Sequence, residues 1–302
     1  MEESELLMNG NKMKLLKVTI SPKSLFGSKI EGDMLFGQIC WHIAYKDEKL
    51  LEKLLVNYAK EPFLIVSDAF KSGYLPKPKL PSHILKERDK TKKKYYRKKV
   101  WLEIDDLLNG RFEKAVEGSF VKSRYEVKNS INRKTSTTQG DMFAPYTVEY
   151  LEYEKFDIYL LIGKEKDLII EKLQEIGEIG FGKDASTGKG RFEIENIEDV
   201  SHFFNLKTNT YVSISSFCMK DNSCENVYYE VYTKYPKTRG DLSNPFKNPL
   251  ILAKTGAGIV CNEEIRFIGN AITNFSNNSK IVHQGYAITL PITQNGEKNE
   301  KV

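Results

Sequence analysis

The sequence predicts an α+β fold in two domains, and three observations lead to this prediction. The 302 residues suffice for two domains of ~150 residues, each with a core of its own. Residues 13–200 contain strand-like and helix-like hydrophobic patterns in alternation, whereas residues 205–293 contain mostly strand-like patterns. Hydrophobic residues form 40% of the chain, with 16 Phe and 16 Tyr, which is polar for a globular protein but sufficient for a packed core.

In residues 13–200 we expect the order strand, helix, strand, strand, strand, helix, loop, strand once a long insertion is set aside. The expected elements, in chain order and with a second helical stretch after the first helix, cover residues 14–20, 34–45, 48–58, 63–66, 142–153, 156–162, 166–176 and 191–194. This order is close to βαββαβ, the arrangement of ferredoxin-like domains and of RNA-recognition modules.

The helix expected at residues 34–45 is predicted from hydrophobic spacing. Leu35, Ile39 and Ile43 recur at the i, i+4, i+8 spacing that places side chains on one face of a helix. Asp33 precedes this stretch, where a carboxylate accepts hydrogen bonds from the free N–H groups of the first turn, so we expect it to be the N-cap. A catalytic acid is the alternative for Asp33, but no second carboxylate in the same motif supports it.

Residues 75–142 interrupt this pattern, and we expect them to form a long insertion that projects from the core. Three prolines between residues 75 and 81 exclude a regular helix or strand there. Residues 86–99 contain nine basic and two acidic residues, so this stretch carries +7, whereas the whole chain carries only +5. Concentrated positive charge favours binding of an anion, and a solvated charged loop is the alternative.

We expect residues 205–293 to form a second, strand-rich domain that is a degenerate copy of the first. Its expected strands cover residues 210–219, 226–233, 250–254, 264–267 and 284–291. Residues 1–12 are expected to be a frayed leader and the polar residues 294–302 a disordered tail.

Composition excludes several classes of protein. No hydrophobic run approaches the ~20 residues that span a bilayer, and the acidic N-terminus lacks the apolar stretch of a signal peptide. The four cysteines, Cys40, Cys218, Cys224 and Cys261, have neither zinc-binding spacing nor the density of a disulfide framework. We therefore expect a cytoplasmic protein with reduced thiols, no metal site and no cofactor.

The densest motif is the glycine-rich loop at residues 180–190, G-F-G-K-D-A-S-T-G-K-G. Glycines let backbone N–H groups approach an anion closely, and two lysines add positive charge. The loop does not match a P-loop, because Lys183 stands where the first glycine belongs and Gly190 where a hydroxyl residue belongs. A dinucleotide-binding turn is excluded too, since here a helix precedes the glycines and a strand follows. We expect a cradle for phosphates or riboses, with a flexible turn as the alternative.

This loop, together with further segments in a fixed order, resembles the RAMP superfamily of CRISPR-associated proteins. The further segments are G-D-M-L-F-G-Q-I-C-W at 32–41, L-P-K-P at 75–78, N-R-K-T at 132–135, K-Y-P-K-T-R-G at 234–240, K-T-G-A at 254–257 and H-Q-G-Y-A at 283–287. Within that superfamily the set is similar to the fourth subunit of the type III-A (Csm) interference complex, over residues 14–292. The K-T-G-A segment departs from the acid-Gly-Ser sequence that is more common in that family.

The resemblance implies a protein of two ferredoxin-like RAMP domains that binds RNA without cutting it. Members of this family bind the 5′ repeat-derived handle of the CRISPR RNA (crRNA) and cap the base of a complex that acts in antiviral defence. They contact the large polymerase-like signature subunit and a RAMP subunit of the backbone filament, and a β-hairpin thumb from the inserted region presses into the guide–target RNA duplex. No membrane is involved. The alternatives are a RAMP endoribonuclease that processes precursor crRNA and an adaptor that contacts only protein.

The charge pattern, the glycine-rich loop and the resemblance together identify candidate RNA contacts and no catalytic residue. The candidates are Lys29, Gln38, Lys77, Arg133, Lys134, Thr135, Phe181, Gly182, Lys183, Ser186, Thr187, Gly188, Lys189, Arg191, Arg239, Lys254 and His283. Phe181 has two alternatives, stacking on a base or anchoring the loop. His42, the candidate base of a nuclease, lies on the apolar face of its helix, and we expect a satisfied core or partner-facing histidine.

Overall fold

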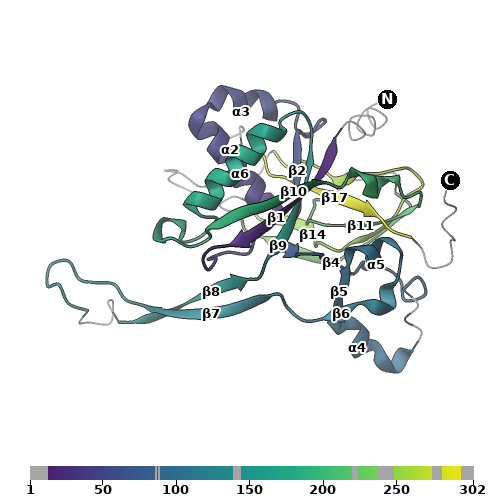
Figure 1. The fold of residues 1–302 in the computed structure, drawn as a ribbon, viewed down its shortest axis with the longest axis horizontal. Helices are drawn as coiled ribbons and strands as arrows, with labels where there is room; N and C mark the ends of the chain where they lie inside the picture. Colours follow the sequence, from purple (N-terminus) through teal and green to yellow (C-terminus); the bar gives the residue numbers. More distant parts are fainter. Residues whose placement is uncertain are drawn as a thin grey trace.

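The computed structural model describes residues 13–85, 87, 89–138, 144–219, 224–236, 248–273 and 281–293. Figure 1 shows a body of packed sheets with helices at one end, a small lobe at the opposite end and a long two-stranded arm that extends sideways. None of the described helices is both long enough and apolar enough to cross a bilayer.

The first half is built on a sheet that two helices cover. Its main strands are β1 (Lys14–Pro22), β2 (Leu64–Val66), β9 (Phe156–Ile162) and β10 (Phe192–Asp199), with the short β3 (Phe70–Lys71) paired to β9. They lie in the order β10-β1-β9-β2 with antiparallel neighbours, which is the 4-1-3-2 order of a βαββαβ unit. Helices α2 (Gly32–Lys46) and α6 (Lys166–Ile179) pack against this sheet, and α3 (Glu48–Leu55) follows α2.

The expectation of a core strand at residues 142–153 is wrong. Strand β8 (Tyr146–Tyr153) pairs with β7 (Val121–Lys128) in a separate two-stranded hairpin, from Val121↔Tyr153 to Lys128↔Tyr146. Figure 1 shows this hairpin leaving the body as the arm. Without β8, the core has the βαββαβ order. The mixture of polar and apolar residues along β8 suits an outlying ribbon as well as a core strand, so the sequence pattern did not separate the two.

The insertion forms two structures rather than one. Strands β4 (Tyr74–Pro76), β5 (Lys99–Glu103) and β6 (Val116–Glu117) form a small sheet, accompanied by α4 (Lys93–Lys98) and α5 (Ile104–Leu108), with short 3₁₀ turns at Lys90–Lys92 and Phe112–Lys114. This is the lobe, and its buried Leu75, Leu102, Leu107 and Phe112 belong to the main core. Residues 75–76 are strand despite the prolines, because β4 is an edge strand and Pro76 is its last residue.

The second half is strand-rich, as expected. Strands β11 (Thr210–Ser213), β12 (Asn226–Tyr228), β15 (Gly258–Val260), β16 (Phe267–Gly269) and β17 (Tyr286–Pro291) form a sheet in the order β12-β15-β11-β17-β16. Strands β13 (Val231–Lys234) and β14 (Leu250–Ala253) form a separate pair. A 3₁₀ turn at Ser201–Asn205 leads in, and no α-helix lies among the described residues after it, so a second ferredoxin-like unit is not confirmed.

The two halves share one core. Val212, Ile288 and Leu290 of the second sheet belong to the same buried cluster as the strands and helices of the first half. The buried Gln284 side chain joins them: its Nε2 donates to the Val66 carbonyl at 2.8 Å and its Oε1 accepts from the Val66 N–H at 2.9 Å. A smaller cluster around Phe217 lies within the second half. The expectation of one independent core per domain is therefore only partly correct.

Candidate nucleic-acid interface

The glycine-rich loop connects α6 to β10, which is the helix–loop–strand order that the sequence predicts. Gly180 caps α6 with φ 118°, and a 3₁₀ turn at Ala185–Thr187 forms the middle of the loop. The Phe181 ring is buried in the core, so of its two alternatives the structure has the anchor. Gly190 must be glycine, because its φ is +76° and a Cβ there would lie 2.2 Å from the Phe181 carbonyl oxygen.

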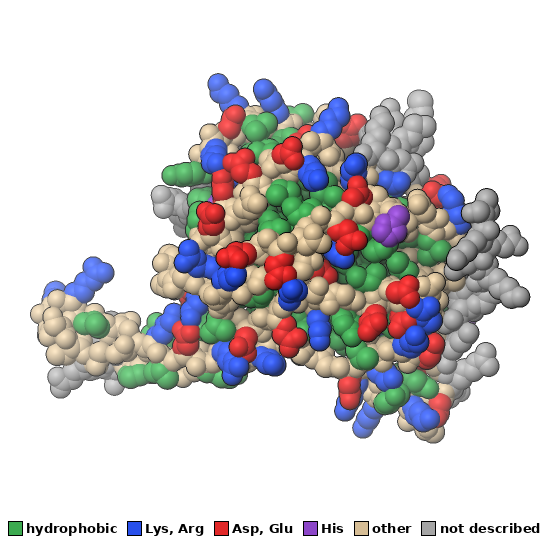
Figure 2. All heavy atoms as spheres, viewed as in Figure 1, with side chains coloured by type: hydrophobic (Ala, Val, Ile, Leu, Met, Phe, Trp, Pro, Cys, Tyr) green, Lys and Arg blue, Asp and Glu red, His purple; other side chains and the backbone are tan. Residues whose placement is uncertain are grey.

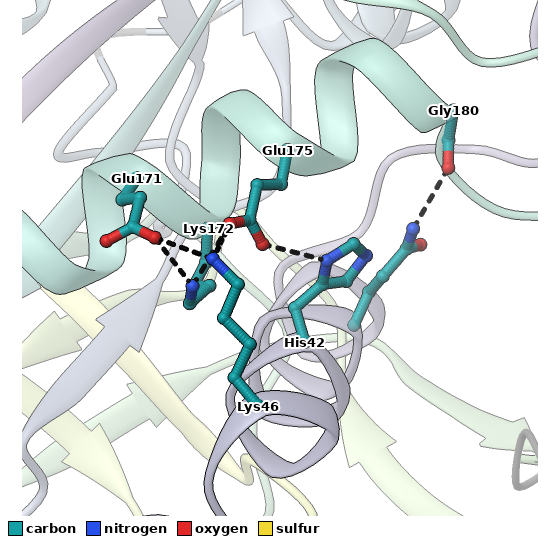
Figure 3. A network of polar contacts seen from close by, with 7 residues as sticks. His42, Lys46, Glu171, Lys172, Glu175 and Gly180 are labelled. Carbon is teal, nitrogen blue, oxygen red and sulfur yellow. Dashed lines mark hydrogen bonds and ion pairs between the residues drawn. The ribbon is translucent and has the colours of Figure 1, made fainter.

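The side-chain amide of Gln38 on α2 holds the loop by two hydrogen bonds. Its Nε2 donates to the Gly180 carbonyl at 3.0 Å and its Oε1 accepts from the Gly182 N–H at 3.2 Å. Figure 3 shows the Gly180 carbonyl turned toward this helix. The side chain is buried, so Gln38 positions the loop backbone by using both polar atoms of its amide.

The outer side of the loop presents polar groups to solvent. Lys183, Ser186, Thr187 and Gly188 are exposed, and nothing lies within 4 Å of a Cβ placed on Gly188. The Lys183 N–H donates to the Ser28 hydroxyl at 3.1 Å, and the Thr187 hydroxyl donates to the Asp184 carbonyl at 2.9 Å. We name Lys183, Ser186, Thr187 and Gly188 the loop crown; a fixed backbone with exposed hydroxyls and a lysine suits contact with a phosphate.

The base of the arm is attached to this loop by the Tyr150 clamp, which consists of Glu126, Lys128, Tyr150, Asp184 and Lys189. The Tyr150 hydroxyl donates to Asp184 Oδ2 at 2.6 Å. The Nζ atoms of Lys128 and Lys189 lie 4.8 and 4.4 Å from the centre of the buried Tyr150 ring. Lys189 also pairs with Glu126 of β7. Lys189, a candidate RNA contact, is therefore already engaged within the protein.

The tip of the arm contains three further candidates. Arg133, Lys134 and Thr135 are exposed in a turn that the Asn132↔Thr137 bridge closes. The Lys134 N–H donates to Asn132 Oδ1 at 2.9 Å, which fixes the turn. On the face that Figure 2 shows, the outer arm carries basic side chains, whereas acidic and basic side chains alternate over the body.

The remaining basic candidates are spread over the molecule. Lys29 is exposed beside α2, and exposed Arg191 donates from Nε to the Glu178 carbonyl at 2.8 Å. Lys77 is largely buried and pairs with Glu87 at 2.5 Å, while Lys254 pairs with Glu230 at 3.3 Å. Arg239 lies outside the described residues.

The structure corrects the expectation for Asp33. Glu31 occupies the N-cap position of α2, and Asp33 lies within the first turn. Asp33 is buried, and its carboxylate lies 2.6 Å from Lys234 Nζ and 3.3 Å from His283 Nε2. A buried carboxylate requires such partners, and these come from residues 200 and more positions away, beyond the reach of local sequence patterns.

His283 therefore lies in this charged cluster rather than on the surface: it is 6% exposed. Lys234 also pairs with Glu31 at 2.5 Å. Nearby, the Asp68 carboxylate accepts a hydrogen bond from the Gly32 N–H at 2.8 Å, and burial raises the pKa of Asp68 to about 7. The charges of Glu31 and Asp33 thus hold the start of α2 against Lys234 of the second half, while Asp68 holds the Gly32 N–H.

Of the two alternatives expected for His42, a core or a partner-facing histidine, the structure has the core histidine. It is buried, and its Nδ1 lies 3.4 Å from Glu175 Oε2 of α6. Figure 3 shows the network around it, in which Lys46 and Lys172 both reach Glu171 and Glu175. Hydrogen bonds from Lys46 and Lys172 lower the pKa of Glu171 to about 2, so this carboxylate stays charged at neutral pH. Within the part of the chain that the structure describes, no three metal-ligating side chains gather.

Sequence reasoning missed the residues that hold the site together. Tyr150, Glu126 and Ser28 are ordinary members of strands or turns in the sequence, and only their contacts with the loop reveal their role. Lys234 stands inside the K-Y-P-K-T-R-G segment, so the resemblance gave a signal for its region but none for its partner Asp33.

The comparisons with known proteins concern the fold. No protein-family model and no curated protein matches the sequence. Among solved structures, a crystal structure of a Csm1-Csm4 cassette in complex with pppApA matches 94% of this chain and 100% of that chain, with a TM-score of 0.60 and 17% identity. The same cassette in complex with cA4 matches 93% of this chain and 98% of that chain, with a TM-score of 0.60 and 16% identity.

A third solved structure is the Csm3-Csm4 subcomplex in the type III-A CRISPR-Cas interference complex. It matches 93% of this chain and 100% of that chain, with a TM-score of 0.56 and 17% identity. The chains matched are Csm4 subunits, and nearly the whole chain takes part. The expected likeness in fold to Csm4 is thus confirmed, whereas the expectation of two ferredoxin-like domains is not.

Proposed function

We propose that this chain is the Csm4-type subunit of a type III-A CRISPR effector complex, where it binds the 5′ handle of the crRNA and caps the base of the complex in the cytoplasm. The observation that carries the proposal is the likeness of fold to Csm4 over 94% of this chain and the whole of the matched chain.

The loop crown supports binding of RNA by its backbone. Glycines with positive φ at 182, 188 and 190 hold the loop in a conformation that other residues rarely adopt. Lys183 adds a point charge and Ser186 adds a hydroxyl donor, while the Thr187 hydroxyl donates to the Asp184 carbonyl and keeps its lone pairs as acceptors; the charge and the donor suit phosphate and ribose rather than base edges. The arm, with Arg133 and Lys134 at its tip, is the proposed thumb against the guide–target duplex.

The matched structures suggest the protein partners. They are described as a Csm1-Csm4 cassette and a Csm3-Csm4 subcomplex. We infer that this chain contacts a large Csm1-type signature subunit and a Csm3-type RAMP subunit of the backbone. The strand-rich second half is, in this proposal, a degenerate ferredoxin-like RAMP domain whose helices have been lost or shortened.

The proposed role is non-catalytic. Asp33 is paired with Lys234, His42 is buried against Glu175, and His283 is buried against Asp33. None of these groups is presented to solvent where it could attack or protonate a bound RNA, which argues against a repeat-cleaving endoribonuclease.

The proposal is tested by RNA binding of the full-length chain and of its complex assembled on guide RNA. Replacing Lys183 and Ser186 by Ala should weaken binding of a 5′-handle RNA about tenfold and lower its salt dependence, because phosphate contacts release counterions. The variant Lys49→Ala, on exposed α3, also loses one positive charge and is the control for lost charge. Unchanged binding and assembly of the crown variant would favour the protein-only adaptor.

The enzymatic alternative is tested by incubating the wild-type protein with repeat RNA, with and without Mg²⁺. We expect no specific cleavage. Cleavage that disappears in His42→Ala would instead identify a processing nuclease.

A further inference from the structure

Two segments of the sequence that are far apart meet in the structure next to a groove. The Lys79 N–H donates to the Gly256 carbonyl at 2.8 Å, and Lys79 forms a parallel bridge with Ala257. A Cβ on Gly258 would lie 2.5 Å from both the Lys79 carbonyl oxygen and Leu80 Cδ2. Lys79, directly after the L-P-K-P segment, is therefore held against the K-T-G-A segment.

The groove beside this junction has a volume of about 470 Å³. It is lined by Lys79, Leu80, Pro81, Val227, Tyr228, Tyr229 and Glu230. Leu80 is buried, whereas Tyr229 remains 39% exposed. One wall thus comes from the insertion and the other from β12 and the residues after it, and the lining residues include aliphatic residues and two tyrosines.

A charged rim flanks the groove. The Glu230 carboxylate lies 2.8 Å from Lys79 Nζ and 3.3 Å from Lys254 Nζ. All three side chains are about half exposed, so the ion pairs are open to solvent and to an incoming ligand. Two cations share one carboxylate, which leaves the rim with a net positive charge.

We propose that this groove binds a single unpaired RNA base that carries an exocyclic amino group, that is cytosine, adenine or guanine, with its phosphate on Lys79 and Lys254. The proposal rests on the proposed function and adds a base subsite to it. A tyrosine face stacks on any base, and lysines bind the attached phosphate as point charges. The Glu230 carboxylate is an acceptor, and it matches an amino group but repels the carbonyl oxygen that uracil has in its place.

The positive rim favours a nucleotide over an apolar peptide segment as the occupant. A phosphate can replace Glu230 as the partner of both lysines, and the released carboxylate becomes free to accept from the base. An apolar peptide side chain would fill the groove but leave the charge of the rim without a complement. A protein partner is accordingly an outcome that the test must be able to detect.

The test combines a variant of the groove with RNAs that lack one base. Synthetic guide RNAs are used whose 5′ handle lacks the base at one position. The full-length chain is assembled on each of these RNAs, and the binding is measured. For the wild-type protein we expect one position at which loss of the base weakens binding about tenfold, the amount that stacking of one base on an aromatic ring contributes. In Tyr229→Ala this penalty should fall below about twofold, whereas in Tyr235→Ala, a control with an exposed tyrosine outside the groove, it should persist.

The amino-group preference is tested at the same position with uracil in place of the natural base. Wild-type protein should bind the uracil RNA more weakly, and Glu230→Gln, whose amide can also donate, should lose that discrimination. Equal thermal midpoints of the variants and the wild type verify that they are folded.

Three outcomes are distinguished. Failure of the wild-type complex to bind any handle RNA overturns the proposed function itself. Normal binding with no abasic position that depends on Tyr229 overturns only the base subsite. Weaker association of Tyr229→Ala with a Csm1- or Csm3-type subunit, with unchanged RNA binding, assigns the groove to a protein partner and also overturns the subsite.

Discussion

Asp33 and Asp68 lie beside the start of α2 in different electrostatic settings. Asp33 faces Lys234 and His283 from the second half of the chain. Asp68 accepts a hydrogen bond from the Gly32 N–H, and burial, together with the charges of Glu31 and Asp33, raises its pKa to about 7. Asp33 therefore has charged partners from distant parts of the chain, whereas the raised pKa of Asp68 favours its protonated form.

The raised pKa of Asp68 predicts a pH dependence of stability. Because the folded state binds this proton more tightly than the unfolded chain, the stabilisation is fully present below about pH 4 and is lost as the pH rises toward about 7. Urea unfolding between these pH values should show a slope for the wild type, at most about 1.4 kcal/mol per pH unit, that Asp68→Asn lacks. Parallel pH profiles of the two proteins would contradict this assignment.

Among the elements, the arm is attached to the glycine-rich loop by the Tyr150 clamp. β7 and β8 pair only with each other, apart from the bridge between Phe26 and Leu151. A two-stranded ribbon is marginally stable alone, so contacts at its base decide how firmly it is held. The Tyr150 clamp supplies such contacts, and it links the proposed thumb to the proposed phosphate cradle.

We expect Tyr150→Phe to loosen the arm. The variant keeps the ring but removes the hydroxyl that donates to Asp184, at a cost of about 1 kcal/mol in the attachment of the arm. Hydrogen exchange of the β7 and β8 amides should become several-fold faster, while β1 and β9 amides keep their protection. Tyr125→Phe, which alters an exposed ring on β7, is the matched control. Exchange that is equally fast in both variants would show that the clamp does not hold the arm.

Across the whole molecule, the two halves are joined by a shared core and by polar bridges. Gln284 pairs with both the N–H and the carbonyl of Val66, in the manner of one more strand residue. Lys234 and His283 bring charge partners from the second half to α2 of the first. These links predict that the halves unfold together rather than as independent domains.

Replacing Gln284 by Ala tests the junction. Loss of its amide leaves two buried backbone groups of Val66 without this partner, so the free energy of unfolding should fall by about 2–4 kcal/mol. Gln174→Ala, at an exposed position of α6, should change it by less than about 0.5 kcal/mol. Denaturant unfolding followed by fluorescence and by circular dichroism measures both. Two separate transitions in the wild type would contradict the shared core.

The local elements of the first half were predictable because their signals lie within a few residues. The 3.6-residue spacing of Leu35, Ile39 and Ile43 predicted α2, and that of Ile169, Leu173 and Ile176 predicted α6.

The strands of the second half were harder to predict. β15 was missed because it begins at Gly258 and is only three residues long. β12 and β13 were predicted as one strand, since the bend at Tyr229 and Glu230 leaves no glycine or proline signal.

The sequence by itself determined the α+β class, the helix–loop–strand setting of the glycine-rich loop and the location of the positive charge, since each depends on neighbouring residues. Only the tertiary structure decided which charges are already paired, which strand belongs to the arm, and which distant segments form a groove. The physical reason is that burial and charge pairing depend on distance in space: Asp33 meets Lys234 and His283 only after the second half packs against α2.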